Sequence, residues 1–306
     1  MPFAFFRRRE GGHRPWDLFL RIARRTAWLI GLGLLLNIVA ALPNLHGLRL
    51  PGVLQRIGLV YLIASPIVLN VGAAGRAAVL VALAVLHWAL LSAGMHAGAI
   101  SQANNVATAL DKAVFGAHIL GQTGDPEGLL GTLPAISTAL LGSIAGECLR
   151  HGAAPDVRIR RLLILGAASS AVGMMWIPAL PLNKSLWTGS FVLWTGGLAA
   201  LILAGCYWLI DVRDHRTWAQ PFLWLGFNPL AIYFLSEVVS HIFDKPWLRV
   251  HGQTLTIRSW LFWDALRPLI PVVNDEWLSL CAAVATVFVW TGLGWLLYRR
   301  GIRLQV

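Results

Sequence analysis

The chain has 306 residues, of which 57% are hydrophobic and 13% are charged, and its formal net charge is +11. Soluble domains carry about 25% charged residues, so the composition excludes an ordinary soluble protein and indicates a helical membrane protein. Nucleic acid is excluded as a partner, because the basic residues flank apolar segments and form no continuous basic patch.

Apolar segments that approach the thickness of a bilayer recur along the whole chain. A membrane-spanning helix needs about 20 mostly apolar residues. We therefore expect an all-α polytopic helical bundle that forms a single transmembrane domain over residues 1–306, with the lipid bilayer as its partner. Its spans, about eight in number, are expected at 26–42, 53–71, 77–95, 133–149, 162–178, 187–210, 221–241 and 278–298. The aromatic segment 257–266 is expected to be a short interfacial helix.

The lysine and arginine residues predict the orientation of this bundle. With a cytoplasmic N-terminus, most of them fall on the inner side, which favours a topology with both termini inside. The protein is then expected to be an integral protein of a bacterial inner (plasma) membrane. In this topology the unusual polar segments all face outward, and they predict an outer polar chamber within the bundle.

The second apolar segment contains an arginine, Arg56, which follows Gln55. A charge within a span costs several kcal/mol unless it faces the bundle interior or a wet cavity and finds a partner. Arg56 could hold a carboxylate or a substrate oxygen in bidentate fashion, so we interpret the pair as part of a polar site. The alternative is an arginine that snorkels to the outer headgroups.

Two carboxylates, Asp125 and Glu127, lie at the start of the fourth apolar segment. Such a pair could deprotonate an amine or orient a sugar. It could equally supply the ion-pair partners of Arg56 or Lys184. The alternative is N-terminal capping, because acidic residues favour the start of a helix.

Asn183 and Lys184 precede the sixth apolar segment. An amide and an ammonium group together suit the recognition of hydroxyl or carboxylate groups. The alternative is an interfacial anchor made of Lys184 and Trp187.

The seventh apolar segment is interrupted at Asn228-Pro229 and carries Glu237 and His241 nearer its outer end. Proline frees a backbone carbonyl, and such breaks often line a cavity; a tolerated kink is the alternative. Glu237 and His241 could form an acid–base pair. No metal site is expected, because no third ligand is in view.

One histidine, His87, lies midway along the third apolar segment. We interpret it as a hydrogen-bonded core residue, with a catalytic role as the alternative.

Four segments together resemble a known family. They are Leu-Pro-Gly-Val-Leu-Gln-Arg-Ile-Gly at 50–58, Asp-Pro-Glu-Gly-Leu-Leu-Gly-Thr-Leu-Pro at 125–134, Asn-Lys-Ser-Leu-Trp-Thr at 183–188 and Gly-Phe-Asn-Pro-Leu-Ala-Ile-Tyr at 226–233. Jointly they resemble the transmembrane acyltransferases related to heparan-α-glucosaminide N-acetyltransferase, and the resemblance runs in order over residues 1–306.

The resemblance implies an acetyl transfer across the membrane. Acetyl-CoA in the cytosol would be the donor, and an amino sugar or another saccharide on the outer face would be the acceptor. The residues expected to bind or orient the acceptor are Gln55, Arg56, Asp125, Glu127, Asn183, Lys184, Asn228 and Glu237. On charge alone, the inner arginines Arg24, Arg25 and Arg150 could meet the CoA phosphates.

The chain departs from the family at its N-terminus. The family has two more spans there, with the catalytic histidine in the outer loop between them, and residues 1–7 resemble the tail of the second one. No histidine of this chain matches the catalytic one, so we expect that residue upstream of Met1. A start inside a helix would leave a hole in the bundle, which favours a misplaced start codon over a truncated, inactive form.

Two other functions stay open at this point. A transporter of a small polar solute fits the intramembrane charge and the broken seventh segment, but no inverted repeat is visible. An inactive subunit that only pairs with other membrane proteins is the other alternative. The sequence also leaves a homodimer open.

Overall fold

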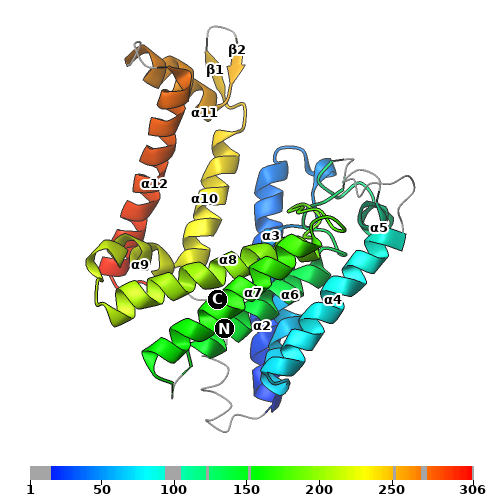
Figure 1. Cartoon of the computed structure of the whole chain (residues 1–306). Helices are drawn as coiled ribbons and strands as arrows, with labels where there is room; N and C mark the ends of the chain where they lie inside the picture. The colour runs from blue at the N-terminus through cyan, green and yellow to red at the C-terminus, as the bar shows by residue number, and fades with distance from the viewer. Residues whose placement is uncertain are drawn as a thin grey trace. The chain divides into compact units, whose positions relative to one another are not determined.

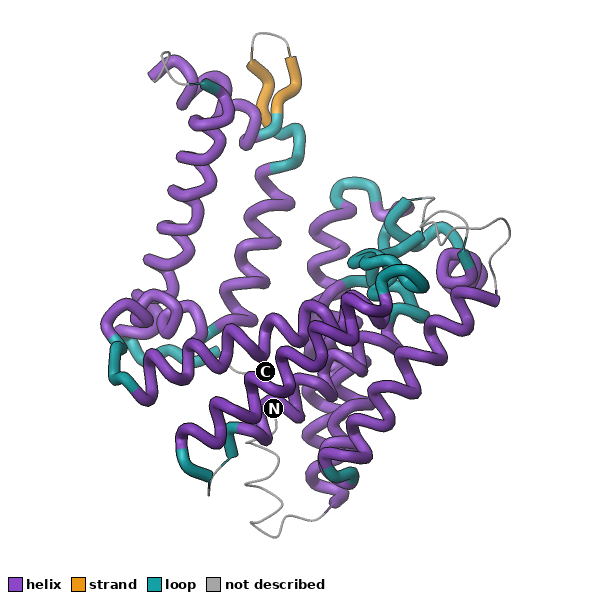
Figure 2. Tube along the Cα trace, in the orientation of Figure 1, coloured by secondary structure: helices purple, strands orange, loops and turns teal. Residues whose placement is uncertain are grey.

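The computed structural model describes residues 15–93, 105–121, 124–150, 153–250, 253–269 and 274–304. These residues are almost entirely helical, as expected, with one short antiparallel ribbon (Figure 2). By their contacts they divide into two compact units. The first consists of Met1–Leu34 and His46–Asp214, and the second consists of Leu35–Leu45 and His215–Val306. The single domain expected from the sequence stays a prediction.

The first unit is a helical bundle (Figure 1). Its helices are the larger part of α2 (Pro15–Ala41), α3 (Val53–Asn70), α4 (Ala73–Ala93), α5 (Val106–Phe115), α6 (Thr132–Cys148), α7 (Pro155–Trp176) and α8 (Gly189–Tyr207), which continues as a π-helical turn over Trp208–Val212. Helix α6 contacts α3, α4, α7 and α8. Its residues Ile136 and Leu140 are buried to 2% and 0% exposure against Leu80 of α4, so α6 is the central helix of this unit.

Helices α7 and α8 pack closely because small residues face each other. A Cβ at Gly173 would lie 2.6 Å from the backbone nitrogen of Trp194, and a Cβ at Gly197 would lie 2.6 Å from that of Ser170. Close backbone approach through small residues is the usual basis of helix pairing in membranes. It explains how α7 packs firmly although few of its large side chains are buried.

The second unit is built around a broken helix. Its elements are α9 (Gln220–Phe227), α10 (Pro229–Phe243), the ribbon β1 (Leu248–Val250) and β2 (Gln253–Leu255), α11 (Ile257–Trp260) with a π-helical turn Leu261–Leu266, and α12 (Asp275–Arg299). Helices α9 and α10 meet at Asn228 with a bend of 71°. The interruption predicted at Asn228-Pro229 is confirmed, and the expected segment 257–266 is helical.

Membrane integration is supported by five helices that are long and apolar enough to span, or six if the bent pair α9–α10 counts as one span. This is fewer than the about eight expected. The segments at 133–149 and 162–178 are helical but fail as spans for different reasons. Helix α6 has 17 residues, a length of roughly 26 Å, and the first two turns of α7 contain Asp156, Arg158, Arg160 and Arg161.

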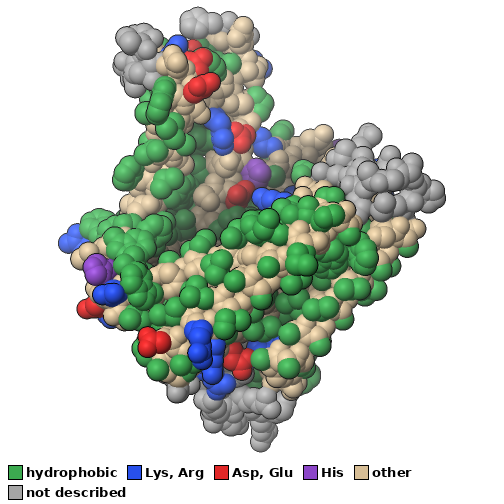
Figure 3. Space-filling model, viewed as in Figure 1, with side chains coloured by type: hydrophobic (Ala, Val, Ile, Leu, Met, Phe, Trp, Pro, Cys, Tyr) green, Lys and Arg blue, Asp and Glu red, His purple; other side chains and the backbone are tan. Residues whose placement is uncertain are grey.

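Apolar side chains cover much of the face shown in Figure 3, as a lipid-facing protein requires. Helix α12 shows this most clearly, since Val287, Phe288 and Val289 are 62%, 70% and 68% exposed. In water such a face would be unfavourable at about 25 cal/mol per Å². In a bilayer it has no such cost.

Candidate functional site

A buried cluster of charges lies in the first unit. It forms where the loop before α3, the start of α3, helix α5, the loop 124–131 and the loop 183–188 come together. Apart from the first two, these segments are far apart in the sequence, and together they contain three of the four motifs that carry the family resemblance.

Arg49 holds the two acidic residues of the loop 124–131. Its Nε donates a hydrogen bond to Asp125 Oδ2 at 2.7 Å, and its Nη2 donates to both Asp125 Oδ1 and Glu127 Oε2. The backbone N–H groups of Leu120 and Glu127 also donate to Asp125, at 3.0 and 2.9 Å. The partner of the two acids is therefore Arg49, not Arg56 or Lys184 as the sequence left open.

These contacts fix the charge state of Asp125. Burial raises the pKa of its carboxyl group, but the hydrogen bonds and charge of Arg49 outweigh burial and hold the pKa below its ordinary value. The side chain has 0% exposure, whereas that of Arg49 has 21%. Asp125 is thus an ionised, fully paired group and a poor proton acceptor.

Arg56 lies beside this cluster without joining an ion pair. Its Nη1 donates to the carbonyl oxygen of Pro126 at 2.8 Å, and its guanidinium lies over the ring of Trp187, 4.0 Å from the centroid. The whole residue is 8% exposed. Within the described residues this is the one hydrogen bond of its side chain, so Nη2 and Nε remain able to donate to a ligand.

The loop 183–188 supplies the ring under Arg56. Trp187 has a φ of +53°, and its Nε1 donates to Thr138 Oγ1 at 3.1 Å. Asn183 shapes the turn, since its Oδ1 accepts a hydrogen bond from Leu186 N at 3.0 Å and its own N–H donates to Thr188 Oγ1 at 3.1 Å. The sequence missed Trp187 as a site residue, although its place in the Asn-Lys-Ser-Leu-Trp-Thr motif was visible.

Lys184 lies on the same loop and is exposed. For both Asn183 and Lys184, contact with an acceptor stays a prediction.

Gln55 lies behind the site rather than in it. Its Nε2 donates to the carbonyl oxygen of Leu50 at 3.1 Å. A Cβ at Gly33 of α2 or at Gly52 would overlap its amide oxygen. These contacts favour a role in positioning the loop that carries Arg49; the predicted contact with an acceptor stays a prediction.

Asp111 is a further carboxylate at the site, and the predicted site did not include it. It comes from α5 and is 1% exposed. Its Oδ1 accepts a hydrogen bond from Leu129 N at 2.9 Å, and a Cβ at Gly128 would overlap Oδ2. Burial raises the pKa of this carboxyl group, and the Leu129 N–H opposes the rise only in part.

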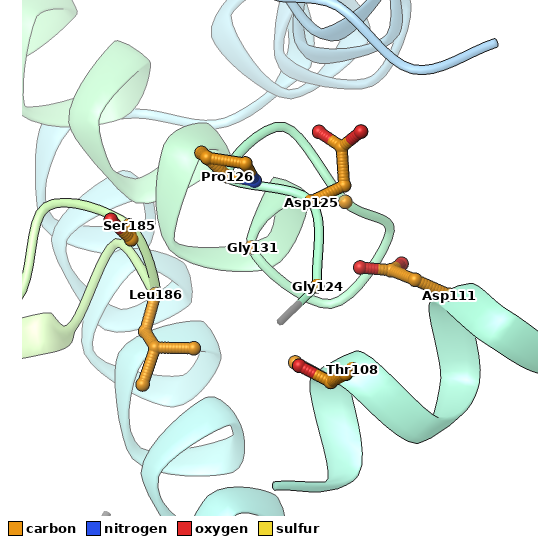
Figure 4. Close-up of a pocket in the computed structure, with 10 residues that line it drawn as sticks. Thr108, Asp111, Gly124, Asp125, Pro126, Gly131, Ser185 and Leu186 are labelled. Atoms are coloured by element: carbon orange, nitrogen blue, oxygen red, sulfur yellow. The ribbon is translucent and has the colours of Figure 1, made fainter. Parts of the chain in front are cut away.

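A small pocket opens between α5 and the loops (Figure 4). It is lined by Ala107, Thr108, Asp111, Gly124, Asp125, Pro126, Gly128, Gly131, Ser185 and Leu186. It has room for about one water molecule, so a sugar ring would have to bind at its mouth. In Figure 4 the carboxylate of Asp111 points toward the loop 124–131, while that of Asp125 points away from Asp111 and Thr108.

The remaining predicted site residues belong to the second unit. Asn228 is 1% exposed, and its amide is occupied by the chain: Nδ2 donates to Ile302 O at 2.7 Å and Oδ1 accepts from Leu304 N at 2.8 Å. Glu237 Oε2 lies 3.8 Å from His241 Nε2, with both side chains partly exposed. A substrate contact stays a prediction for both Asn228 and Glu237. No group of three metal-ligating side chains occurs among the described residues.

His87 is completely buried in α4. Neither of its ring nitrogens has a hydrogen-bond partner among the residues that the structure describes. The prediction of a hydrogen-bonded core residue is therefore confirmed for its burial and not for its hydrogen bonding.

Comparison with known proteins agrees with the motif pattern. No protein-family model matches the chain. The chain is 35% identical over 130 residues to heparan-alpha-glucosaminide N-acetyltransferase of Homo sapiens, covering 40% of this chain and 20% of that protein. The protein of the same name from Mus musculus is 32% identical over 132 residues, with the same coverage of 40% and 20%. The match spans about a fifth of the length of these relatives, and it shows distant, partial homology of this membrane protein to heparan-alpha-glucosaminide N-acetyltransferase.

Proposed function

We propose that the protein is an integral membrane acyltransferase that transfers an acetyl group from cytosolic acetyl-CoA to an amino sugar or another saccharide on the outer face. The observation that carries the proposal is the buried polar cluster of the first unit. There Arg49 holds the carboxylates of Asp125 and Glu127, and Arg56 donates to the carbonyl oxygen of Pro126, next to the pocket that Asp125 and Pro126 line. The partial homology to a membrane N-acetyltransferase supports the reaction class.

The residues of the cluster divide into holding and binding groups. Arg49 ties the loop 124–131 to the loop before α3 through Asp125 and Glu127. Arg56 is held on one side by Pro126 O and below by Trp187, which leaves donors for a hydroxyl or carbonyl oxygen of a ligand. Because a buried guanidinium presents its donors in a fixed planar fork, it would orient an oxygen ligand well.

The donor would approach from the other end of the bundle. There Arg76 of α4 is buried, and it donates to Ser143 Oγ at 3.0 Å and pairs with Glu147, both of α6. Helix α7 begins soon after the end of α6 in the chain, and its first two turns contain three arginines. We assign Arg24, Arg25 and Arg150 to the CoA phosphates on charge alone. An inner placement of this end, with both termini in the cytoplasm, is part of the proposal.

The test is acetyl transfer by the full-length protein, purified from its native locus and reconstituted in vesicles. Labelled acetyl-CoA is supplied on one side and glucosamine on the other, and the acetylated sugar is measured. Arg56→Ala is expected to lower transfer by about 100-fold, the loss of about 3 kcal/mol for a buried charged hydrogen-bond donor. Arg56→Lys keeps the charge but loses the planar fork, so it should recover part of the rate.

Lys112→Ala is the matched control, since Lys112 is an exposed cation on α5, outside the pocket lining. If wild-type protein transfers no acetyl group to any amino sugar or saccharide, the proposed function is wrong. If transfer occurs and Arg56→Ala is as active as wild type in a folded protein, the role of Arg56 is wrong.

A transporter of a small polar solute is the second candidate. The observation in its favour is the 71° break between α9 and α10, because broken helices often line the substrate path of transporters. Uptake of the sugar into vesicles without acetyl-CoA would favour this function over transfer.

A further inference from the structure

The carboxylates around the pocket differ in how they are neutralised. Asp125 accepts two hydrogen bonds from Arg49 and two from backbone N–H groups. Glu127 shares Nη2 of the same arginine. Asp111 forms no ion pair with any described residue, although it is 1% exposed. A buried carboxylate without a cation is costly, and such groups are concentrated at functional sites.

The position of Asp111 brings it to the pocket wall. It lies one helical turn after Thr108 on α5, and both residues line the pocket. Figure 4 shows their oxygens directed toward the loop 124–131. The hydrogen bond from Leu129 N occupies Oδ1, while Oδ2 lies against Gly128, where the lack of a side chain leaves space for it.

A purely structural role explains only part of this arrangement. Asp111 does hold the loop through Leu129 N, but an asparagine oxygen would accept the same hydrogen bond without burying a charge. Replacing a carboxylate by an amide would therefore lower the cost of holding the loop. Unlike the amide, a carboxyl group can also take up and release a proton.

We propose that Asp111 is the group that accepts the proton of the acceptor's amine or hydroxyl, and that Asp125 and Glu127 are fixed anions that hold Arg49. This inference rests on the proposed acetyl transfer and names the base for it. It reverses the expectation that the adjacent pair Asp125 and Glu127 does the acid–base work.

For an amine acceptor the protons and bonds balance. Asp111 takes one proton from the ammonium group, and the freed lone pair of nitrogen forms a bond to the acetyl carbonyl carbon. The carbon–sulfur bond of acetyl-CoA breaks, and the leaving sulfur takes the second nitrogen-bound proton. The products are an N-acetyl sugar and the CoA thiol, and Asp111 returns its proton to water.

The charged groups near Asp111 agree with this role. Asp125 lines the same pocket from the loop 124–131, with its carboxylate turned away from Asp111 and held by Arg49. Glu127 is held by the same arginine, Arg56 comes from α3, and Lys112 on the helix of Asp111 is exposed. Burial raises the pKa of Asp111 and the Leu129 N–H opposes the rise. The charge of Asp125 adds to the rise, and the backbone N–H of Asp125 opposes it. A base is most effective when its pKa approaches the working pH.

The first experiment compares the pH–rate profiles of three full-length proteins in vesicles: wild type, Asp111→Asn and Asp125→Asn. The amide introduced by Asp111→Asn can still accept the hydrogen bond from Leu129 N, so the loop should stay in place. We expect Asp111→Asn to lower kcat/KM by at least about 100-fold and to lose the acidic limb of the profile. Asp125→Asn should keep that limb. The inference is overturned if Asp111→Asn keeps an unchanged acidic limb and its kcat/KM falls by less than about threefold.

The second experiment does not depend on acetyl transfer. A hydrophobic carbodiimide, dicyclohexylcarbodiimide, modifies protonated carboxyl groups in apolar surroundings, and the modified peptide is identified by mass spectrometry. We expect Asp111 to be labelled, less so as the pH rises, and Asp125 to stay unlabelled. Label on Asp125 with none on Asp111 overturns the inference. If the wild-type protein is labelled as expected but transfers no acetyl group, the result counts against the proposed function alone.

Discussion

Replacing Arg49 by glutamine is the sharpest test of the buried charge cluster. The substitution leaves Asp125, whose side chain has 0% exposure, without its cation. Removing one partner of a buried pair costs about 3–5 kcal/mol. Arg49 itself is 21% exposed, and Asp125 keeps two backbone donors, so we expect the low end, about 3 kcal/mol. The measurement is the free energy of unfolding in detergent micelles, by denaturant titration at neutral pH.

The matched control is Arg258→Gln, which breaks a surface pair. Arg258 and Asp244 are 60% and 51% exposed and their side chains lie 2.7 Å apart, so its loss should cost less than about 1 kcal/mol. Equal losses for Arg49→Gln and Arg258→Gln would refute the reasoning. The double variant Arg49→Gln, Asp125→Asn should recover part of the loss, because the uncompensated charge is gone.

The pH dependence of the stability of Arg49→Gln is an independent test of the same ion pair. The pKa of Asp125 is lowered in the folded protein, so the stability it contributes is present above the ordinary aspartate pKa of about 3.9 and is lost as the pH falls through the lower folded value. In Arg49→Gln this contribution is missing. The difference in stability between wild type and variant should therefore be full at about pH 6–7 and shrink below about pH 4.

Two further predictions concern aromatic residues near or below the site. Trp187→Leu removes the ring under Arg56 and should weaken acceptor binding roughly fivefold, about 1 kcal/mol, whereas Trp187→Phe should keep most of the binding. The KM for the acceptor measures both effects. Equal KM values for wild type and both variants would contradict a role of the Arg56–Trp187 contact in binding. His87→Leu removes an imidazole whose two nitrogens have no partner among the described residues, so the free energy of unfolding should rise by about 1 kcal/mol. A fall in the free energy of unfolding would instead show that a bound water or ligand satisfies the ring.

The sequence predicted the main helices and the burial of Arg56, because both depend on local patterns. A long apolar segment predicts a helix. An arginine within it predicts a side chain that faces the protein interior, and the burial of Arg56 confirms this. The ion-pair partner of the two acids could not be predicted in this way. Arg49 and Asp125 are 76 residues apart in the chain, and only the packing of α3, α5 and α6 selects Arg49 from the neighbouring cations.

Local patterns do not distinguish a binding amide from a structural one. Asn183 and Asn228 combine a donor and an acceptor, which suits a sugar but suits a turn or a chain end equally well. In the structure both amides are used by the backbone. The sequence likewise predicts α6 and α7 as ordinary spans because their apolar runs are visible. The helix bounds show instead that α6 has only 17 residues and that the first two turns of α7 are charged.

The distribution of charges itself indicates where a ligand would bind. Most of the charge in the buried cluster lies in Arg49, Asp125 and Glu127, and these groups satisfy one another. A ligand gains little from groups whose hydrogen bonds are already made, because each new bond would replace an old one. Arg56 retains donors, and Asp111 has a carboxyl group that forms no ion pair with any described residue. A hydroxyl-bearing or amine acceptor would therefore gain most from Asp111 on the pocket wall and from Arg56 beside it, whereas Arg49, Asp125 and Glu127 would hold the loop 124–131 in place.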